Sequence, residues 1–293
     1  MSLAVFSQGE PIVQQLTGKE ATGSQNAQVI QDGLSPDMAF FAHNVPMIFL
    51  PSRDLRGQLW ASVLSAWADF TNVVSDSEIM LDNSCLLSNT EDIFWGNMEP
   101  DQEIGMLFID LQTRRGVPIN GWIAHRECTG ELKQSNVIRI VANIPRWIIS
   151  LETFHQAPMM RKLKEWINLA DICFVASASK SGKMDVSHLG GMSGFITLKG
   201  AEILIIPDYD GNSLFCTLGN FLQNPVTGIT SLDFSTGNTL QFTGTATVDL
   251  NEKCAFENGK RRFWKFRIMS EISGNSINGF SIRFIDFFPF NSK

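Results

Sequence analysis

The chain has 293 residues, of which 44% are hydrophobic and 18% charged, and its formal net charge at pH 7 is −7. This composition is typical of a globular protein with a substantial core and excludes an intrinsically disordered chain. The lysines and arginines are scattered along the sequence, so it lacks the concentrated basic footprint of a nucleic-acid-binding protein. We therefore expect no nucleic acid partner.

The N-terminus and the cysteines bear on the compartment. The opening MSLAVFSQGEP lacks a basic region followed by an apolar core, and no apolar run is long enough to cross a bilayer. The five cysteines include no CxxC pair, and the four histidines have no metal-type spacing. We expect a cytoplasmic protein with reduced thiols, no membrane segment and no metal site.

In chain order, the first predicted element is a helix over residues 35–44, SPDMAFFAHN. Ser35 followed by Pro36 and Asp37 is a typical helix start. The segments that follow alternate short apolar runs with glycine-containing turns, which is typical of antiparallel strands.

The second half of the chain repeats this order. A helix is expected within PMMRKLKEWINLA (158–170), and a strand, a turn and a second strand within DICFVASASKSGKMDVSHL (171–189). After further strand segments comes a short amphipathic helix, SLFCTLGNFLQNP (213–225), which we expect to be capped by Asn212 or Ser213. A hairpin with an STGN turn and a last strand, RRFWKFRIMSEI, complete the half.

Two pairs of windows in the chain match each other in sequence and at nearly the same spacing. The windows that begin at Ile104 and Thr227 match at one constant offset, and those that begin at Phe49 and Phe174 match at a similar one. The matched pairs are Gly105 and Gly228, Asp110 and Asp233, Gly121 and Gly244, Phe49 and Phe174, Ser52 and Ser177, Gly57 and Gly182, and Ser62 and Ser187; the first register also matches Asn97 with Asn220.

The repeat predicts a mainly β protein in which a small antiparallel barrel with a few helices is made twice. We expect the halves to comprise residues 1–150 and 151–293, with the boundary near SLETFHQAP. Because the join is short, the two barrels should pack face to face and form an intramolecular pair that mimics a homodimer.

The segments ADICFVASASKSGKMDVSHLGGMSGFI, IPDYDGNSLFCTLGNFLQNPVTGITSLDFSTGNTLQFTGTATV and FFPFNS resemble the pyridoxamine 5'-phosphate oxidase-like, FMN-binding split-barrel proteins, and in particular their long two-barrel members. The resemblance is strongest from Ala170 to Val248. It implies tandem split barrels that form an intramolecular pseudo-dimer, flavin mononucleotide in the groove between them, and hydride or electron transfer through the flavin. A small-molecule substrate or redox partner and a homodimer are also implied.

The resemblance assigns cofactor contacts on the short helix. Asn220 matches the family's helix motif, whereas Thr217 stands where a lysine is common. A hydroxyl donates one hydrogen bond but brings no charge to a phosphate, so Lys183, Lys180, Arg53 or Arg56 would have to supply it. Helix-end capping is an equally good interpretation of Asn220.

The strand before the Gly190-Gly191 pair is the other expected contact. Alternation puts Asp185 and Ser187 on one face and His188 on the other, which rules out a hydrolytic pair between adjacent Ser187 and His188. Ser187 is the best candidate for a phosphate or ring contact, and Asp185 and His188 are neighbours in the same site. A plain hairpin with a solvated histidine is the alternative.

The leading hypothesis is an FMN-binding oxidoreductase of the pyridoxamine 5'-phosphate oxidase-like class, with its substrate and catalytic residues unassigned. The alternative is a non-catalytic split-barrel protein that has lost the flavin or binds another planar ligand such as haem. No GxGxxG or GxxxxGK motif occurs, so the sequence shows no dedicated nucleotide site for a reductant.

Overall fold

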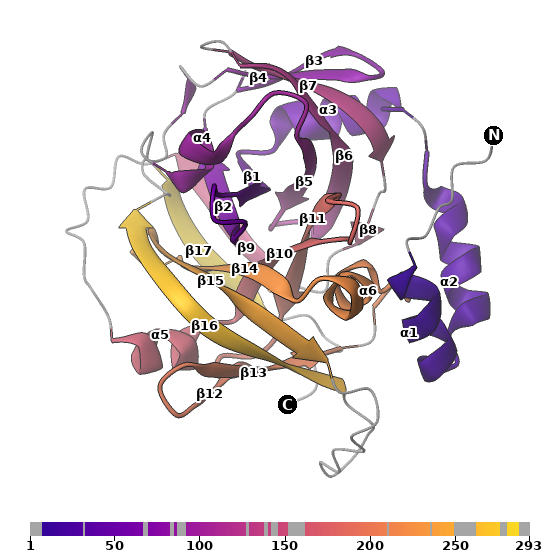
Figure 1. Ribbon diagram of the computed structural model, residues 1–293. Helices are drawn as coiled ribbons and strands as arrows, with labels where there is room; N and C mark the ends of the chain where they lie inside the picture. Colours follow the sequence, from indigo (N-terminus) through magenta and orange to yellow (C-terminus); the bar gives the residue numbers. More distant parts are fainter. Residues whose placement is uncertain are drawn as a thin grey trace.

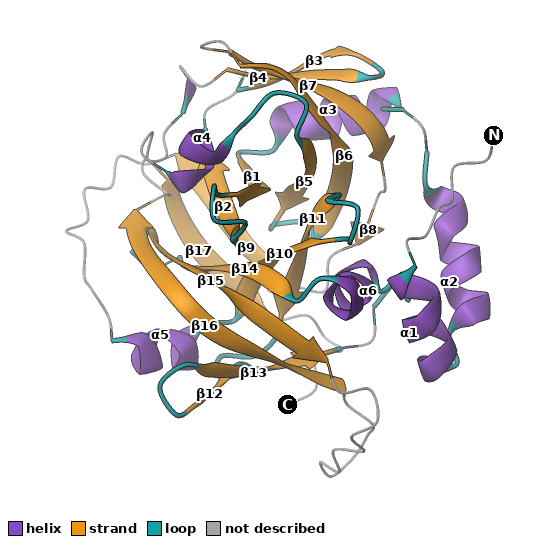
Figure 2. Ribbon diagram, in the orientation of Figure 1, coloured by secondary structure: helices purple, strands orange, loops and turns teal. Residues whose placement is uncertain are grey.

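A computed structural model describes most of the chain and shows a mainly β protein with peripheral helices (Figure 2). The described residues are 8–31, 33–66, 70–82, 85–86, 92–126, 129–137, 140–141, 146–151, 162–209, 211–234, 236–248, 262–275 and 280–286.

The first half begins with helices and continues into an antiparallel sheet (Figure 1). Its helices are α1 (Gly9–Thr17), α2 (Glu20–Asn26), the 3-10 turn η1 (Ala27–Val29), α3 (Pro36–Asn44) and α4 (Ile93–Asn97). Its strands are β1 (Met47–Arg53), β2 (Leu59–Ser65), β3 (Thr71–Ser75), β4 (Glu78–Asp82), β5 (Glu103–Asp110), β6 (Arg115–Arg126), β7 (Thr129–Val137), β8 (Ile140–Val141) and β9 (Arg146–Leu151).

The second half repeats the pattern with fewer helices. Its helices are α5 (Leu163–Leu169) and α6 (Cys216–Gln223). Its strands are β10 (Ile172–Ala178), β11 (Met184–Gly190), β12 (Thr197–Lys199), β13 (Ile203–Asp208), β14 (Val226–Asp233), β15 (Asn238–Val248), β16 (Arg262–Asn275) and β17 (Phe280–Asp286).

The two sheets have the same strand order. The first runs β2-β1-β5-β6-β7-β4-β3 with β8 beside β6, and the second runs β11-β10-β14-β15-β16-β13-β12. Each strand of the second sheet therefore has a counterpart at the same place in the first. This arrangement confirms the predicted tandem split barrels; β17 pairs instead with β9, which contains the expected boundary between residues 150 and 151. That boundary stays a prediction.

The repeat extends to individual strand pairs. Gly121 lies opposite Ile104, and Gly244 lies opposite Thr227, so the two matched glycines occupy equivalent positions. The register between β6 and β7 shifts at Gly121, and the register between the equivalent strands β15 and β16 shifts at Gly244. Because a β-bulge bends and twists a strand, the two sheets are bent at equivalent positions.

The buried apolar side chains lie in a core within each half and in a further cluster between the halves. The cluster between them contains Phe49, Ala61 and Leu107 from the first half and Phe174 and Val186 from the second, among others. Burial of this shared cluster holds the barrels together face to face, since removing apolar surface from water is the main favourable term in such packing.

A ring stack marks the pseudo-two-fold axis. Phe49 and Phe174 are equivalent residues, and their rings stack with centroids 3.3 Å apart and planes inclined by 8°. A residue that contacts its own counterpart lies on the axis that relates the two halves. The predicted intramolecular pseudo-dimer is thus present in the fold.

Two matched glycines allow the barrels to approach closely. A Cβ added to Gly105 would lie 2.6 Å from the carbonyl oxygen of Met184 at the start of β11, and one added to Gly228 would lie 2.7 Å from the backbone of Trp60 in β2. No side chain fits at either distance. The glycines therefore let β11 lie against β5 and β2 lie against β14.

Most predicted elements are confirmed. The hydroxyl of Ser35 accepts a hydrogen bond from the Met38 amide and caps α3 as expected. The cap expected for α6 is wrong: Phe215, in a left-handed conformation, occupies the cap position, and Asn212 instead accepts from the Leu214 amide. The sequence analysis missed α1 and α2, and residues 158–161 of the helix expected before β10 lie outside the described residues.

Candidate functional site

The candidate site lies where β11, which contacts α6 of its own half, meets β5 of the first half. Alternation along β11 sends Val186 into the cluster between the halves and Leu189 toward the core of the second half. Ser187 shares the face of Leu189, and its hydroxyl hydrogen-bonds the Thr217 hydroxyl of α6 at 2.6 Å. Both hydroxyls are partly exposed. The tertiary structure thus brings together two of the residues that the sequence singled out.

Asn220 holds α6 to the sheet. Its side-chain amide donates to the Ser177 hydroxyl at 2.9 Å, and the equivalent Asn97 donates to the equivalent Ser52 at 3.1 Å. The same bond in both halves explains the asparagine in each helix. Asn220 is also buried, so its amide is committed to Ser177.

His188 lies on the opposite face of β11, across from Phe174. His188 is partly exposed as a residue, but the surrounding protein desolvates the ring and lowers the pKa of His188 to about 4. Within the described residues the ring has no hydrogen-bond partner. At neutral pH a neutral imidazole therefore lies beside the seam between the halves.

Asp185 shares the Ser187 face and lies close to a second carboxylate. Burial, with a contribution from Glu10, raises the pKa of Asp185 to about 6. Burial, with contributions from Asp185 and Glu10, raises the pKa of the Cys216 thiol at the start of α6. The first turn of this helix is therefore acidic.

The acidic neighbour comes from α1, which lies beside α6 (Figure 1). A Cβ added to Gly9 would lie 2.0 Å from the carbonyl oxygen of Gly219, and one added to Gly219 would lie 2.6 Å from the Glu10 amide nitrogen. Two glycines thus allow backbone contact between the helices and bury Glu10. Sequence reasoning missed Glu10, because the docking of α1 is a long-range contact.

The expected cations lie at a different end of the site. Lys180 and Lys183 are exposed in the turn between β10 and β11, and the Lys180 amide donates to the Gln223 side chain at the C-terminal end of α6. Arg53 reaches this turn from the first half, since a Cβ added to Gly182 would lie 3.7 Å from its guanidinium nitrogen. The positive charges therefore gather at the junction of two hairpins.

The equivalent place in the first half, where β2 and α4 meet the second half, is closed. The two N–H groups of the Gln241 side-chain amide are shared among three acceptors, which are the Ala61 carbonyl at 2.9 Å, the Ser62 hydroxyl at 3.0 Å and the Asp92 carboxylate at 3.3 Å. Burial raises the pKa of Asp92, while hydrogen bonds from Ser62, the Phe94 amide and Gln241 oppose the rise. A satisfied polar network fills this end of the seam.

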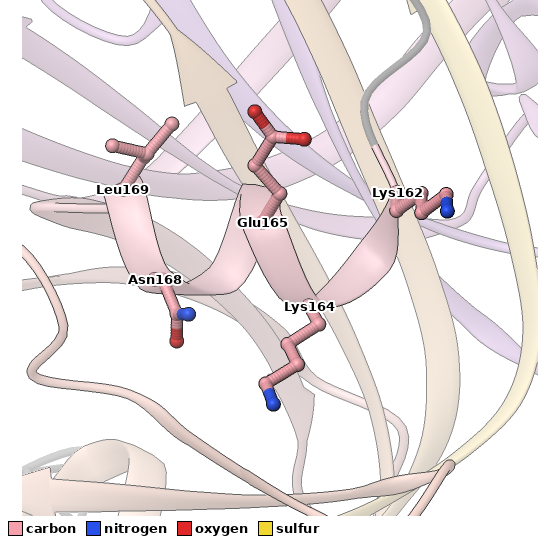
Figure 3. Close-up of a pocket in the computed structure, with 5 residues that line it drawn as sticks. All are labelled: Lys162, Lys164, Glu165, Asn168 and Leu169. Atoms are coloured by element: carbon pink, nitrogen blue, oxygen red, sulfur yellow. The ribbon is translucent and has the colours of Figure 1, made fainter.

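A surface depression of about 410 Å³ lies along α5, away from these residues (Figure 3). Its lining residues, Lys162, Lys164, Glu165, Asn168 and Leu169, all belong to one helix and its cap. Their side chains point in different directions, so they form no convergent set of contacts for a ligand.

Two further kinds of site were sought among the described residues. No group of three or more His, Cys, Asp and Glu there is arranged to hold a metal ion. No helix in that part of the chain is long and apolar enough to cross a membrane.

The donor set fits the phosphate of flavin mononucleotide at one end of the site and not at the other. At the first turn of α6, the Ser187 and Thr217 hydroxyls bond each other and lie with Asp185 and Glu10, whose carboxylates repel a phosphate dianion. At the hairpin junction, Arg53 and the two lysines carry positive charge that would suit a phosphate.

No family model and no curated protein matches this sequence. Solved structures do show similarity. HupZ from Group A Streptococcus is 15% identical over 41% of this chain and 100% of its own, with a TM-score of 0.31. The haem storage protein HutZ from Vibrio cholerae is 12% identical over 40% of this chain and 94% of its own, with a TM-score of 0.29.

A Clostridium acetobutylicum protein related to general stress protein 26, of the pyridoxinephosphate oxidase family, is 10% identical over 38% of this chain and 89% of its own, with a TM-score of 0.28. The family named from the sequence motifs thus appears among the similar structures. At these TM-scores the matches carry no functional argument, and the tandem barrel architecture rests on the strand order and register described above.

Proposed function

We propose that this protein binds a flavin, with flavin mononucleotide as the candidate, in the seam between β11 and β5, and passes electrons or hydride through it to a small molecule or redox partner. The observation that carries the proposal is the meeting of Ser187 and Thr217 at 2.6 Å beside this seam. Those two positions are among those at which the family resemblance implies ligand contacts.

Each group in the site has a defined capacity. The hydroxyls of Ser187 and Thr217 donate or accept hydrogen bonds without changing charge. His188, held neutral by a pKa of about 4, offers one donor and one acceptor to a polar ring edge. Arg53 and Lys183 offer permanent positive charge at the hairpin junction. A bound flavin would supply the redox chemistry.

The charge distribution favours the hairpin junction as the place for the phosphate. Asp185 and Glu10 raise the negative potential near the first turn of α6, so a dianion there is disfavoured. Arg53, from the other barrel, lies against the turn that carries Lys180 and Lys183. A phosphate held by these groups would contact both halves of the chain.

The absorption spectrum of the purified protein and its titration with flavins test the proposal. Flavin mononucleotide should bind more tightly than riboflavin, which lacks the phosphate. Arg53→Gln should weaken mononucleotide binding by roughly tenfold to a hundredfold, the effect of losing one charge-assisted hydrogen bond, and leave riboflavin binding unchanged. Arg56→Gln is the matched control, because Arg56 is exposed in the next turn. A colourless protein that binds neither flavin would refute the proposal.

A second candidate is a non-catalytic two-barrel protein that has lost the flavin or binds another planar ligand such as haem. The acidic residues Glu10 and Asp185 beside the short helix favour a protein that has lost the flavin, because their carboxylates repel a phosphate near Thr217. Two results together would support this alternative: no flavin binds, and titration with haem gives an absorption band whose position differs between the wild-type protein and His188→Ala.

A further inference from the structure

The pseudo-two-fold axis creates two equivalent places along the seam between the barrels. In the first half, β2 lies beside α4 and meets β14 and β15; in the second half, β11 lies beside α6 and meets β5. Ser187 and Ser62 occupy the same position in these two places, since they pair with the equivalent residues Val175 and Leu50. Perfect symmetry would make two identical ligand sites.

The equivalent serines have different partners. Ser187 bonds Thr217 within its own half. Ser62 instead accepts a hydrogen bond from Gln241 of the opposite half and donates one to Asp92. Thr230, beside Gln241 on the neighbouring strand, donates to the Ala61 carbonyl at 2.6 Å. The hydrogen bonds of the first-half place, beside β2, therefore cross the seam.

At the second-half place, beside β11, the equivalent hydrogen bonds cannot form because the donors are missing. Leu107 and Pro118 pair across β5 and β6 as Thr230 and Gln241 pair across β14 and β15. Neither Leu107 nor Pro118 has a side-chain donor. Phe215 precedes α6 where Asp92 precedes α4, so the carboxylate is also missing. Sequence divergence between the halves thus restricts the bonded network to one side of the axis.

Solvent exposure follows the same division. Ser62 is 0% exposed, Gln241 4% and Asp92 7%, whereas Ser187 and Thr217 are partly exposed. A ligand entering the first-half place, beside β2, would have to break hydrogen bonds that satisfy buried polar groups. Leaving such groups unpaired costs about 1–3 kcal/mol each. At the place beside Ser187, Leu107 and Pro118 form no such bonds, because neither has a side-chain donor.

We propose that Ser62, Asp92 and Gln241 form a lock that closes the first-half site, so that the protein binds one ligand per chain, beside β11. The single ligand rests on the proposed function, but the lock does not. The lock also gives Gln241 the role of a positioning residue, since it joins β15 of one barrel to β2 and α4 of the other.

Hydrogen exchange of the wild-type protein tests the lock without a ligand. β2 and β11 are equivalent edge strands with the same backbone pairing to β1 and β10. The amides of residues 60–63 should exchange at least about tenfold more slowly than those of residues 185–188, as expected if one extra hydrogen bond must open. Equal or faster exchange in β2 would overturn the lock.

A variant and a stoichiometry complete the test. Gln241→Ala should bring exchange in residues 60–63 close to that in residues 185–188, whereas Gln112→Ala, in the exposed turn after β5, should leave it unchanged. Calorimetric titration with flavin mononucleotide should give one site per chain, and two equivalent sites would refute the inference. If no flavin binds, the proposed function fails, and hydrogen exchange alone decides the lock.

Discussion

Replacing Phe49 by alanine tests the ring stack on the pseudo-two-fold axis. Phe49 is 0% exposed and stacks on Phe174 at a centroid distance of 3.3 Å. Phe-to-Ala changes in a core cost about 3–5 kcal/mol, because burial is lost and the cavity relaxes only partly. About 0.5–1.5 kcal/mol of that loss belongs to the aromatic pair.

Thermal unfolding followed by circular dichroism measures the effect. With roughly 2–4 °C per kcal/mol for chains of 150–250 residues, Phe49→Ala should lower the melting temperature by about 6–20 °C. The exposed Phe40, with 72% of its surface accessible, is the matched control, and Phe40→Ala should change stability by less than about 0.5 kcal/mol.

A double-mutant cycle with Phe174→Ala shows whether the two rings share the energy. Residues in contact usually couple by about 0.5–3 kcal/mol, so the double variant should lose less stability than the sum of the single ones. Strict additivity, or a melting shift for Phe49→Ala no larger than for Phe40→Ala, would refute the idea that the two barrels meet at this stack.

Further predictions concern the site and pH. Ser187→Ala should lower flavin affinity by roughly twofold to tenfold, the effect of losing one hydrogen bond to the neutral ring, and unchanged flavin content with a small melting shift would remove Ser187 from the site. Thr217→Lys should change the affinity for flavin mononucleotide by less than about threefold, because the lysine would pair with the nearby carboxylates; a tenfold gain absent with riboflavin would place the phosphate at α6. Burial, with a smaller contribution from Asp233, raises the pKa of Asp171 to about 7, so the folded state binds this proton more tightly than the unfolded state. The stability gained by Asp171→Asn should therefore be largest above pH 7 and shrink as the pH falls toward 4, whereas a constant difference in denaturant unfolding across this range would contradict the shift.

Several features of this protein follow from local sequence. The cap of α3 by Ser35 needs only neighbouring residues, and so does the division of β11 into a face with Ser187 and a face with His188. The internal repeat, read from matched glycines and serines, predicted two sheets of one design, and the equivalent bulges at Gly121 and Gly244 confirm it. Periodicity and turn chemistry act over a few residues, so the sequence displays them directly.

The partners of the site residues were decided only by the tertiary structure. Alternation along β11 shows which side Ser187 faces but does not select Thr217 as its partner. Docking of α1 onto α6 brings Glu10 to Asp185 from the far end of the chain. Gln241 closes one side of the seam, whereas its counterpart Pro118 has no side-chain donor and leaves the other side without this network. These contacts depend on how whole elements pack, and packing is set by long-range burial that no local pattern of residues encodes.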